Sequence, residues 1–218
     1  MTDTPELPLE HRTIAADGEG PHPAVVILHG RGADETDLLP IAQRLPDELF
    51  VLSLRAPDPL QGGYTWYELD LSGGGLHQSQ PHPEQFRRSL DLVDESIETA
   101  VEAYNLDADR IGLLGFSQGG ITSLSLLLET PEKYDWVAAL HCYLPDSHCE
   151  LDPDGIENTP VFIAGGNQDQ IIPPGRTEAA ATRLSEIGTP VTSRTYETGH
   201  GIGPDEHADL LEWIDGQV

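Results

Sequence analysis

Basic side chains are scarce in this sequence. Eleven Lys and Arg residues stand against 38 Asp and Glu residues, and Lys133 is the only lysine. The formal net charge at pH 7 is −27, with the acidic residues spread along the chain and not gathered into a tail. A nucleic acid would be repelled, because its phosphates need basic side chains to neutralise them. We therefore expect no nucleic-acid partner.

Cysteine is also scarce, with Cys142 and Cys149 as its only two positions. Two cysteines exclude the disulfide framework that stabilises many small secreted domains. Each follows a histidine, but the pairs His141-Cys142 and His148-Cys149 have the spacing of no common zinc site. A disulfide between them is the other alternative, which a cytoplasmic chain disfavours. We expect two free thiols and no metal site.

Long apolar runs are missing as well. No run reaches the roughly 20 residues that cross a bilayer, and residues 1–12 lack the basic and apolar segments of a signal peptide. We expect no membrane span, no signal peptide and a cytoplasmic location. A chain of 218 residues, 38% of them hydrophobic, suits a single domain over 1–218 with a polar lead-in at 1–23. Monomer and homodimer both remain open.

The negative charge predicts a response to salt. Self-repulsion destabilises a compact state, and it becomes weak where the Debye length falls to about 3 Å, near 1 M salt. We interpret the chain as that of a halophile, the alternative being an ordinary acidic protein. The thermal unfolding midpoint, followed by circular dichroism, is expected to rise by about 5 °C or more between about 0.1 M and about 2 M KCl. A flat response would contradict the halophilic hypothesis.

Glycine, by contrast, is plentiful, and one cluster has a special order. An apolar stretch from Ile111 leads into Gly115-Phe116-Ser117-Gln118-Gly119, a G-x-S-x-G pattern, and residues 121–128 then have helical spacing. Strand, tight turn and helix in this order predict a nucleophile elbow, which exposes a serine hydroxyl at the carboxyl edge of a sheet. Glycines flank the serine because the two backbones approach too closely for a Cβ. The alternative is a glycine-rich turn whose serine caps the helix.

Apolar runs alternate with segments of helical spacing along the rest of the chain. The predicted strands are 24–28, 50–54, 111–116, 136–140, 160–164 and 191–196, with a short edge strand near 12–15. The predicted helices are 38–45, 83–104, 121–128, 173–188 and 210–214. Continuous apolar runs suit strands that are buried on both faces. The alternation predicts an α/β fold, a mostly parallel central sheet with helices on both faces.

Three reactive side chains follow the ends of predicted strands, namely Ser117, Asp169 and His200. The carboxyl ends of parallel strands meet at one edge of a sheet, where functional residues gather. A serine hydroxyl becomes a good nucleophile when an imidazole takes its proton, and a carboxylate can orient that imidazole. Taken singly, Asp169 suits a turn before Pro173, and His200 suits an ordinary loop. The order Ser, Asp, His is that of the α/β-hydrolases.

The strand 24–28 ends in His29-Gly30-Arg31-Gly32, a second feature that suits acyl transfer. A carbonyl under attack becomes an oxyanion, which needs two preorganised N–H donors. We expect these from the backbone of Gln118, which follows the serine, and of Arg31, whose flanking glycines let the backbone approach. The alternative is an ordinary glycine-rich strand exit.

Several segments in the correct order, LHGRGADETDLLP, RAPDPLQGGYTWYEL, GFSQGG, LHCYLP, GNQDQIIP and ETGHGI, resemble the phospholipase/carboxylesterase family of α/β-hydrolases. This family includes the acyl-protein thioesterases, and the resemblance runs from about residue 24 to the end. It implies the α/β-hydrolase fold without a large cap domain. It also implies Ser117, Asp169 and His200 as catalytic triad, and Arg31 with Gln118 as oxyanion hole.

The resemblance implies a serine carboxylesterase that acts through an acyl-enzyme on Ser117. The expected substrate is a small-molecule ester or thioester, and ester hydrolysis requires no cofactor. A lysophospholipase or an acyl-protein thioesterase is the alternative. A non-catalytic binding protein on the same fold is disfavoured because all three triad residues are present.

The glycine-rich region 57–83 is expected to be a long loop that supplies substrate contacts. The resemblance places Trp66 and Tyr67 at the acyl pocket, and Leu76 is a further expected contact. The alternative for Trp66 is that it only packs the loop against the domain.

The sequence departs from the family pattern at two positions. Arg31 stands where the family often has Leu, a change at the pocket entrance that leaves the backbone N–H in place. His141-Cys142 stands where the family often has Ser-Gly, which bears on the acyl-chain preference.

Overall fold

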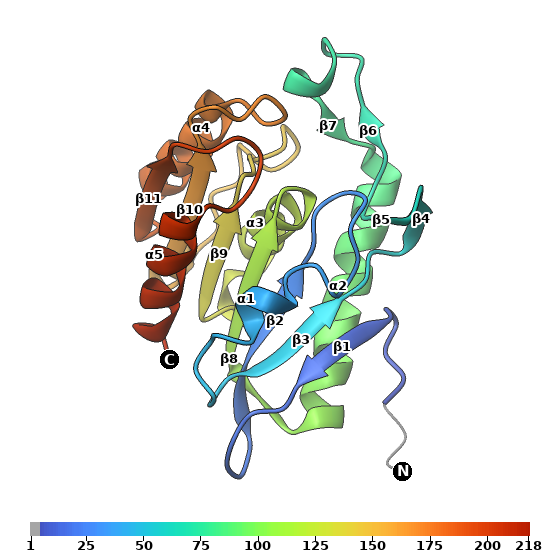
Figure 1. Ribbon diagram of the computed structural model, residues 1–218, viewed down its shortest axis with the longest axis vertical. Coiled ribbons are helices and arrows are strands. Elements are labelled where there is room, and N and C mark those ends of the chain that lie inside the picture. Colours follow the sequence, from blue (N-terminus) through green and yellow to red (C-terminus); the bar gives the residue numbers. More distant parts are fainter. Residues whose placement is uncertain (1–4) are drawn as a thin grey trace.

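A central sheet of seven strands organises residues 5–218, the part of the chain that the computed structural model describes (Figure 1). Its strands are β1 (His11–Ile14), β2 (His22–Leu28), β3 (Phe50–Leu54), β8 (Leu106–Phe116), β9 (Trp136–Leu140), β10 (Val161–Gly166) and β11 (Val191–Tyr196). They lie in the order β1-β3-β2-β8-β9-β10-β11. β1 pairs with β3 in antiparallel fashion, and the other neighbours are parallel. The predicted, mostly parallel sheet is confirmed.

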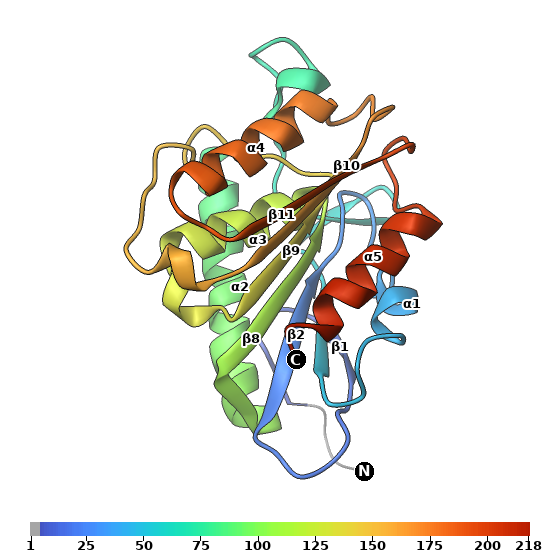
Figure 2. The same ribbon diagram turned by 90° about the vertical axis from the view of Figure 1, so that its left-hand side faces the viewer.

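Helices cover both faces of the sheet (Figure 2). One face carries α2 (Pro83–Tyr104), α3 (Gln118–Glu129) and α4 (Pro174–Glu186), and the other carries α1 (Leu39–Ala42) and α5 (Pro204–Asp215). Each layer has its own apolar core, with Leu90, Leu124 and Leu184 in the first and Leu210 and Ile214 in the second. No helix within residues 5–218 is both long enough and apolar enough to cross a lipid bilayer.

The connection between β3 and α2 is more ordered than the expected loop over 57–83. Two short antiparallel pairs lie in it: β4 (Asp58–Leu60) with β5 (Gly63–Thr65), and β6 (Leu69–Asp70) with β7 (Gln80–Pro81). The 3₁₀ helix η1 (Leu76–Gln78) lies between β6 and β7, and the others are η2 (Pro131–Lys133) and η3 (Ile156–Asn158). Within the described residues, this excursion holds only short strands and one 3₁₀ helix, and no large cap domain is formed.

The helix predicted over 38–45 is shorter in the structure. Regular α-helix extends only over Leu39–Ala42, with Pro40 in its first turn. Beyond it the hydrogen bonds reach three residues back, from Arg44 N–H to the Ile41 carbonyl and from Leu45 N–H to the Ala42 carbonyl. The apolar spacing is therefore kept by tighter turns, which bury the same face.

Candidate active site

Ser117 lies on the sharp turn between β8 and α3. Its backbone has φ 54° and ψ −116°, in the region that residues with a Cβ seldom adopt. The Ser117 N–H donates to the Leu140 carbonyl of β9 over 2.9 Å, which fixes the turn against the neighbouring strand. The side chain is 8% exposed, so the hydroxyl lies at the surface of a largely buried site.

Close backbone packing explains the glycines around Ser117. A Cβ on Gly119 would lie 1.9 Å from the Leu28 carbonyl oxygen, and one on Gly115 would lie 2.3 Å from the Gly119 carbonyl oxygen. Real Cβ atoms do not approach so closely, so the start of α3 can cross β2 and β8 only with glycine at both positions. The expected backbone approach at the elbow is confirmed.

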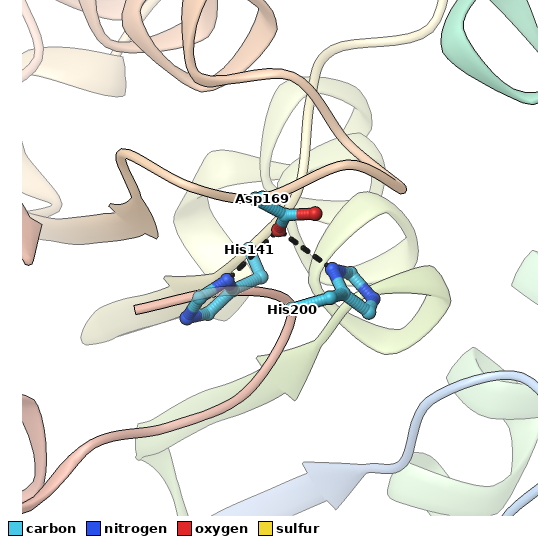
Figure 3. Close-up of side chains that lie close together, drawn as sticks. All are labelled: His141, Asp169 and His200. Carbon is cyan, nitrogen blue, oxygen red and sulfur yellow. Dashed lines mark hydrogen bonds and ion pairs between the residues drawn. The ribbon is translucent and has the colours of Figure 1, made fainter. Parts of the chain in front are cut away.

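The structure brings the three sequence-predicted side chains together. His200 Nε2 lies 3.0 Å from Ser117 Oγ, and His200 Nδ1 lies 2.7 Å from Asp169 Oδ2. Asp169 comes from the loop after β10, and His200 from the loop after β11 (Figure 3). A continuous path for hydrogen bonding therefore runs from the carboxylate through the imidazole to the hydroxyl.

The environment of Asp169 favours the carboxylate. Its Oδ1 accepts from the Ile171 and Ile172 N–H groups over 2.9 and 3.0 Å. Burial opposes ionisation, but hydrogen bonds from His200, His141 and these two N–H groups outweigh it and lower the pKa of Asp169. The residue is therefore ionised at neutral pH.

Two backbone N–H groups are available beside Ser117. Gln118 is the first residue of α3, where an N–H has no partner within its helix, and Arg31 lies in the turn after β2. Neither N–H donates to an acceptor within residues 5–218. Arg31, Gln118, Ser117 and His200 all line one cavity, so the residues expected to supply the oxyanion donors border the same space as Ser117.

Hydrogen bonds hold the turn that carries Arg31. Gly32 N–H donates to the Tyr64 carbonyl over 2.7 Å, and Tyr64 N–H donates to the Ala33 carbonyl over 2.8 Å. Beneath the turn, Ala56 N–H donates to His29 Nε2, so the ring proton is on Nδ1 and is donated to the Gly30 carbonyl. Burial lowers the pKa of His29, which keeps this ring neutral.

Trp66 and Tyr67 do not contact this cavity, which corrects the expectation that they line the acyl pocket. Both side chains are fully buried. The indole of Trp66 donates to the His29 carbonyl over 2.8 Å. The Gln118 side chain accepts from Trp66 N–H and donates to the Tyr67 carbonyl. The two aromatics therefore join β5 to the elbow and to the turn after β2, and their role is support.

The cavity beside Ser117 has a volume of about 300 Å³. Its apolar lining consists of Leu69, Leu76, Ile121, Tyr143, Ile171 and Ile172. Leu76 and Ile171 are 46% and 43% exposed, so they form an open, apolar rim. Leu76, the further contact expected from the sequence, is thus one of the lining residues, and its contact with substrate stays a prediction.

His141 is the residue that sequence reasoning missed. Its Nδ1 lies 3.0 Å from Asp169 Oδ2, the oxygen that also accepts from His200 (Figure 3). Its Nε2 lies 3.1 Å from Glu206 Oε2. From the sequence, His141 was considered as half of a His-Cys pair and, with Cys142, as a departure from the family's Ser-Gly. Its place at the carboxyl end of β9, level with the other strand exits, was the available signal.

The two thiols are free, as predicted, with Cys142 buried and Cys149 partly exposed. Burial raises the pKa of Cys142, so this thiol is unreactive at neutral pH. His141, Asp169 and His200 offer metal-ligating atoms within 4.8 Å of one another. Hydrogen bonds between the two rings and the carboxylate account for that proximity.

Comparison with known proteins identifies the family. Residues 9–217 match the family described as Phospholipase/Carboxylesterase. An acyl-protein thioesterase 1 from Emericella nidulans is 31% identical over 160 residues, 69% of this chain and 66% of the relative.

Two solved carboxylesterase structures have a similar fold. A Bacillus cereus carboxylesterase has a TM-score of 0.84 at 25% identity, covering 96% of this chain and 95% of its own. A Mesorhizobium loti carboxylesterase has a TM-score of 0.83 at 25% identity, covering 99% and 97%. The chain has the α/β-hydrolase fold, and it is a hydrolase that belongs to the phospholipase/carboxylesterase family.

Proposed function

We propose that this protein is a serine carboxylesterase that hydrolyses small carboxylic esters or thioesters through an acyl-enzyme on Ser117. The observation that carries the proposal is the hydrogen-bonded path from Asp169 Oδ2 through His200 to Ser117 Oγ, with steps of 2.7 and 3.0 Å. It begins in a carboxylate and ends at a hydroxyl in an open cavity, the arrangement that acyl transfer requires.

Acylation follows from these contacts. His200 Nε2 takes the hydroxyl proton as Ser117 Oγ attacks the substrate carbonyl carbon. The carbonyl oxygen becomes an oxyanion and accepts from the N–H groups of Arg31 and Gln118. The tetrahedral intermediate collapses as the carbon–oxygen or carbon–sulfur bond to the leaving group breaks. His200 returns the proton to that group, and the acyl chain remains on Ser117.

Deacylation repeats the sequence with water as the nucleophile. His200 takes a proton from the water, which attacks the acyl carbon, and then gives the proton to Ser117 Oγ as the ester bond breaks. The carboxylate of Asp169 stabilises the imidazolium in both halves and does not itself take the proton. None of these steps calls for a cofactor.

The cavity lining supports an apolar acyl group as the bound part of the substrate. The aliphatic side chains Leu69, Leu76 and Ile172 face the space next to the hydroxyl. A larger cavity of about 820 Å³ shares Tyr143 with the first, and it offers room for a bulky leaving group or a longer chain. A lysophospholipid or an acylated protein, the substrate class in the name of the fungal relative, is therefore the second candidate.

We further propose that residues 1–218 act as one domain in the cytoplasm, as a monomer or homodimer. The free thiols support this location.

A panel of p-nitrophenyl esters of increasing acyl length, with matching thioesters, tests the function in about 2 M KCl. Burial of a methylene is worth about 0.8 kcal/mol, so kcat/KM is expected to rise about fourfold per added methylene until the cavity is full. Stopped-flow traces should show a burst of one p-nitrophenol per enzyme. Absence of hydrolysis across the panel, with no labelling of Ser117 by a fluorophosphonate, would contradict the proposal.

A further inference from the structure

Both ring nitrogens of His141 face carboxylates inside the protein. Nδ1 contacts Asp169 Oδ2 at 3.0 Å, and Nε2 contacts Glu206 Oε2 at 3.1 Å. The side chains of His141 and Glu206 are completely buried. The ring of His141 lies across that of His200, with centroids 5.6 Å apart and planes at 88°, so it adjoins the catalytic base (Figure 3).

The positions of the protons follow from these contacts. Asp169 is ionised and Oδ2 can only accept, so His141 Nδ1 must carry a proton. The contact between Nε2 and Glu206 Oε2 also needs one proton. The pair is therefore either an imidazolium beside a carboxylate or a neutral imidazole beside a carboxylic acid.

The surroundings favour the charged form. Glu206 lies in the first turn of α5, where the helix dipole stabilises a negative charge, and its Oε2 also accepts from the Gly203 N–H over 3.4 Å. Burial opposes a charge on His141, but hydrogen bonds from its ring to Glu206 and Asp169 outweigh this and raise its pKa. An imidazolium between two carboxylates leaves one net negative charge in the cluster.

The backbone of His141 is adapted to this position. Its φ is 49°, an uncommon value for a residue with a side chain, and its N–H donates to the Ala164 carbonyl of β10 over 2.6 Å. Phe116 is next to Ser117 in the chain. The centroid of its ring lies 5.4 Å from that of His141 and 5.1 Å from that of His200. The site is therefore built into the exit of β9 and the elbow together.

We propose that His141 is a positioning residue held as an imidazolium between Asp169 and Glu206, where it fixes the catalytic carboxylate and places a positive charge beside the catalytic base. The inference rests on the proposed function for its catalytic readout. A positive charge on the His141 ring, whose centroid lies 5.6 Å from that of His200, opposes a second positive charge on His200, so the two rings are electrostatically coupled. The second N–H donor on Oδ2 keeps the Asp169 carboxylate in one orientation.

The titratable side chains that face the His141 ring come from three different elements. His200 faces it from the loop after β11, Asp169 from the loop after β10 and Glu206 from α5. The Tyr196 hydroxyl of β11 lies near enough to Glu206 for the two groups to interact electrostatically. It donates a hydrogen bond to Asp209 of α5 over 2.7 Å.

The first test is the pH profile of kcat/KM for His141→Gln and His141→Leu. Glutamine can donate to Asp169 but carries no charge, so its plateau is expected within about threefold of wild type. Its acidic limb should lie about 0.5 to 1 pH unit higher, because His200 becomes protonated more easily without the neighbouring cation. Leucine removes both the hydrogen bond to Asp169 and the positive charge, and it should also lower kcat about 10- to 100-fold. An acidic limb of His141→Gln within about 0.2 unit of wild type would overturn the proposal, leaving His141 a packing residue.

The second test reads the charge of His141 without catalysis. In ¹⁵N imidazole NMR spectra, the His141 signals are assigned by their loss in His141→Gln. Wild type should keep both ring protons at pH 8, and Glu206→Gln should have only one near pH 7. Asp209→Asn is the matched control, because it removes a carboxylate from the same helix without touching His141, and it should match wild type in both assays. A singly protonated His141 in wild type at pH 7 would refute the proposal even if catalysis by Ser117 is established.

Discussion

Replacement of Ser117 by alanine is expected to lower kcat/KM by about 10⁴-fold or more. The side chain supplies the only atom of the site that bonds covalently to the acyl group in the proposed mechanism. Alanine leaves the turn and the N–H groups of Arg31 and Gln118 in place, so substrate can still bind while attack falls to unassisted water. Initial rates on the best ester of the panel, with active-site titration, measure the loss.

The chain offers a matched control for this experiment. Ser147 Oγ lies 2.8 Å from His148 Nδ1, and His148 Nε2 lies 3.0 Å from Glu129 Oε1, so a second serine, histidine and acid stand in contact. Ser147 and His148 line a different cavity from Ser117. Ser147→Ala should keep kcat/KM within about twofold of wild type. Turnover that survives in Ser117→Ala but is lost in Ser147→Ala would move the chemistry to that second group.

The strands were the most predictable part of the fold. The predicted segments 50–54, 136–140 and 191–196 agree with β3, β9 and β11 at both ends. The first two are buried throughout and are apolar except for Ser53, so their composition leaves little choice of element or bounds. β8 begins at Leu106, earlier than predicted, because its polar first residues still extend the strand and Leu106 pairs with His22 across a register shift.

That Ser117, Asp169 and His200 meet was predictable because their arrangement is encoded locally. Each of the three residues lies within four residues of the end of a parallel strand, and the strand exits of one sheet must converge. The supporting residues have no such local code. Whether Trp66 lines a pocket or braces a loop depends on its contacts with Gln118 and the His29 carbonyl, which are remote in the sequence.

The pair His141 and Glu206 illustrates the same limit. These residues are 65 positions apart, and in the sequence Glu206 has the features of an ordinary acidic residue in the first turn of a helix. Only the packing of α5 against the exit of β9 makes them partners. Chemistry at strand ends can thus be inferred from order along the chain, whereas chemistry between a strand and a helix requires the tertiary structure.

Asp169→Asn is expected to lower kcat by about 10³- to 10⁴-fold while KM stays within about threefold. In wild type each carboxylate oxygen of Asp169 accepts two hydrogen bonds. Oδ1 accepts from the N–H groups of Ile171 and Ile172, and Oδ2 accepts from His200 and His141. An asparagine amide has only one oxygen, and its NH₂ group can donate but cannot accept. In either orientation of the amide, the NH₂ group therefore faces two N–H donors that need an acceptor. With NH₂ toward the rings, His200 must present a bare Nδ1 and carry its proton on Nε2, where it can no longer accept the Ser117 proton.

The opposite amide orientation avoids that tautomer only by turning NH₂ toward the N–H groups of Ile171 and Ile172. This leaves buried donors unpaired and moves the loop that carries residue 169. Both orientations therefore impair the base, and the loss should appear in kcat at every pH, measured by steady-state kinetics beside thermal melts. Asp205→Asn removes an exposed carboxylate from the start of α5 and should leave kcat within about twofold. If Asp169→Asn stayed folded and within about tenfold of wild type, His200 would owe its orientation to something other than this carboxylate.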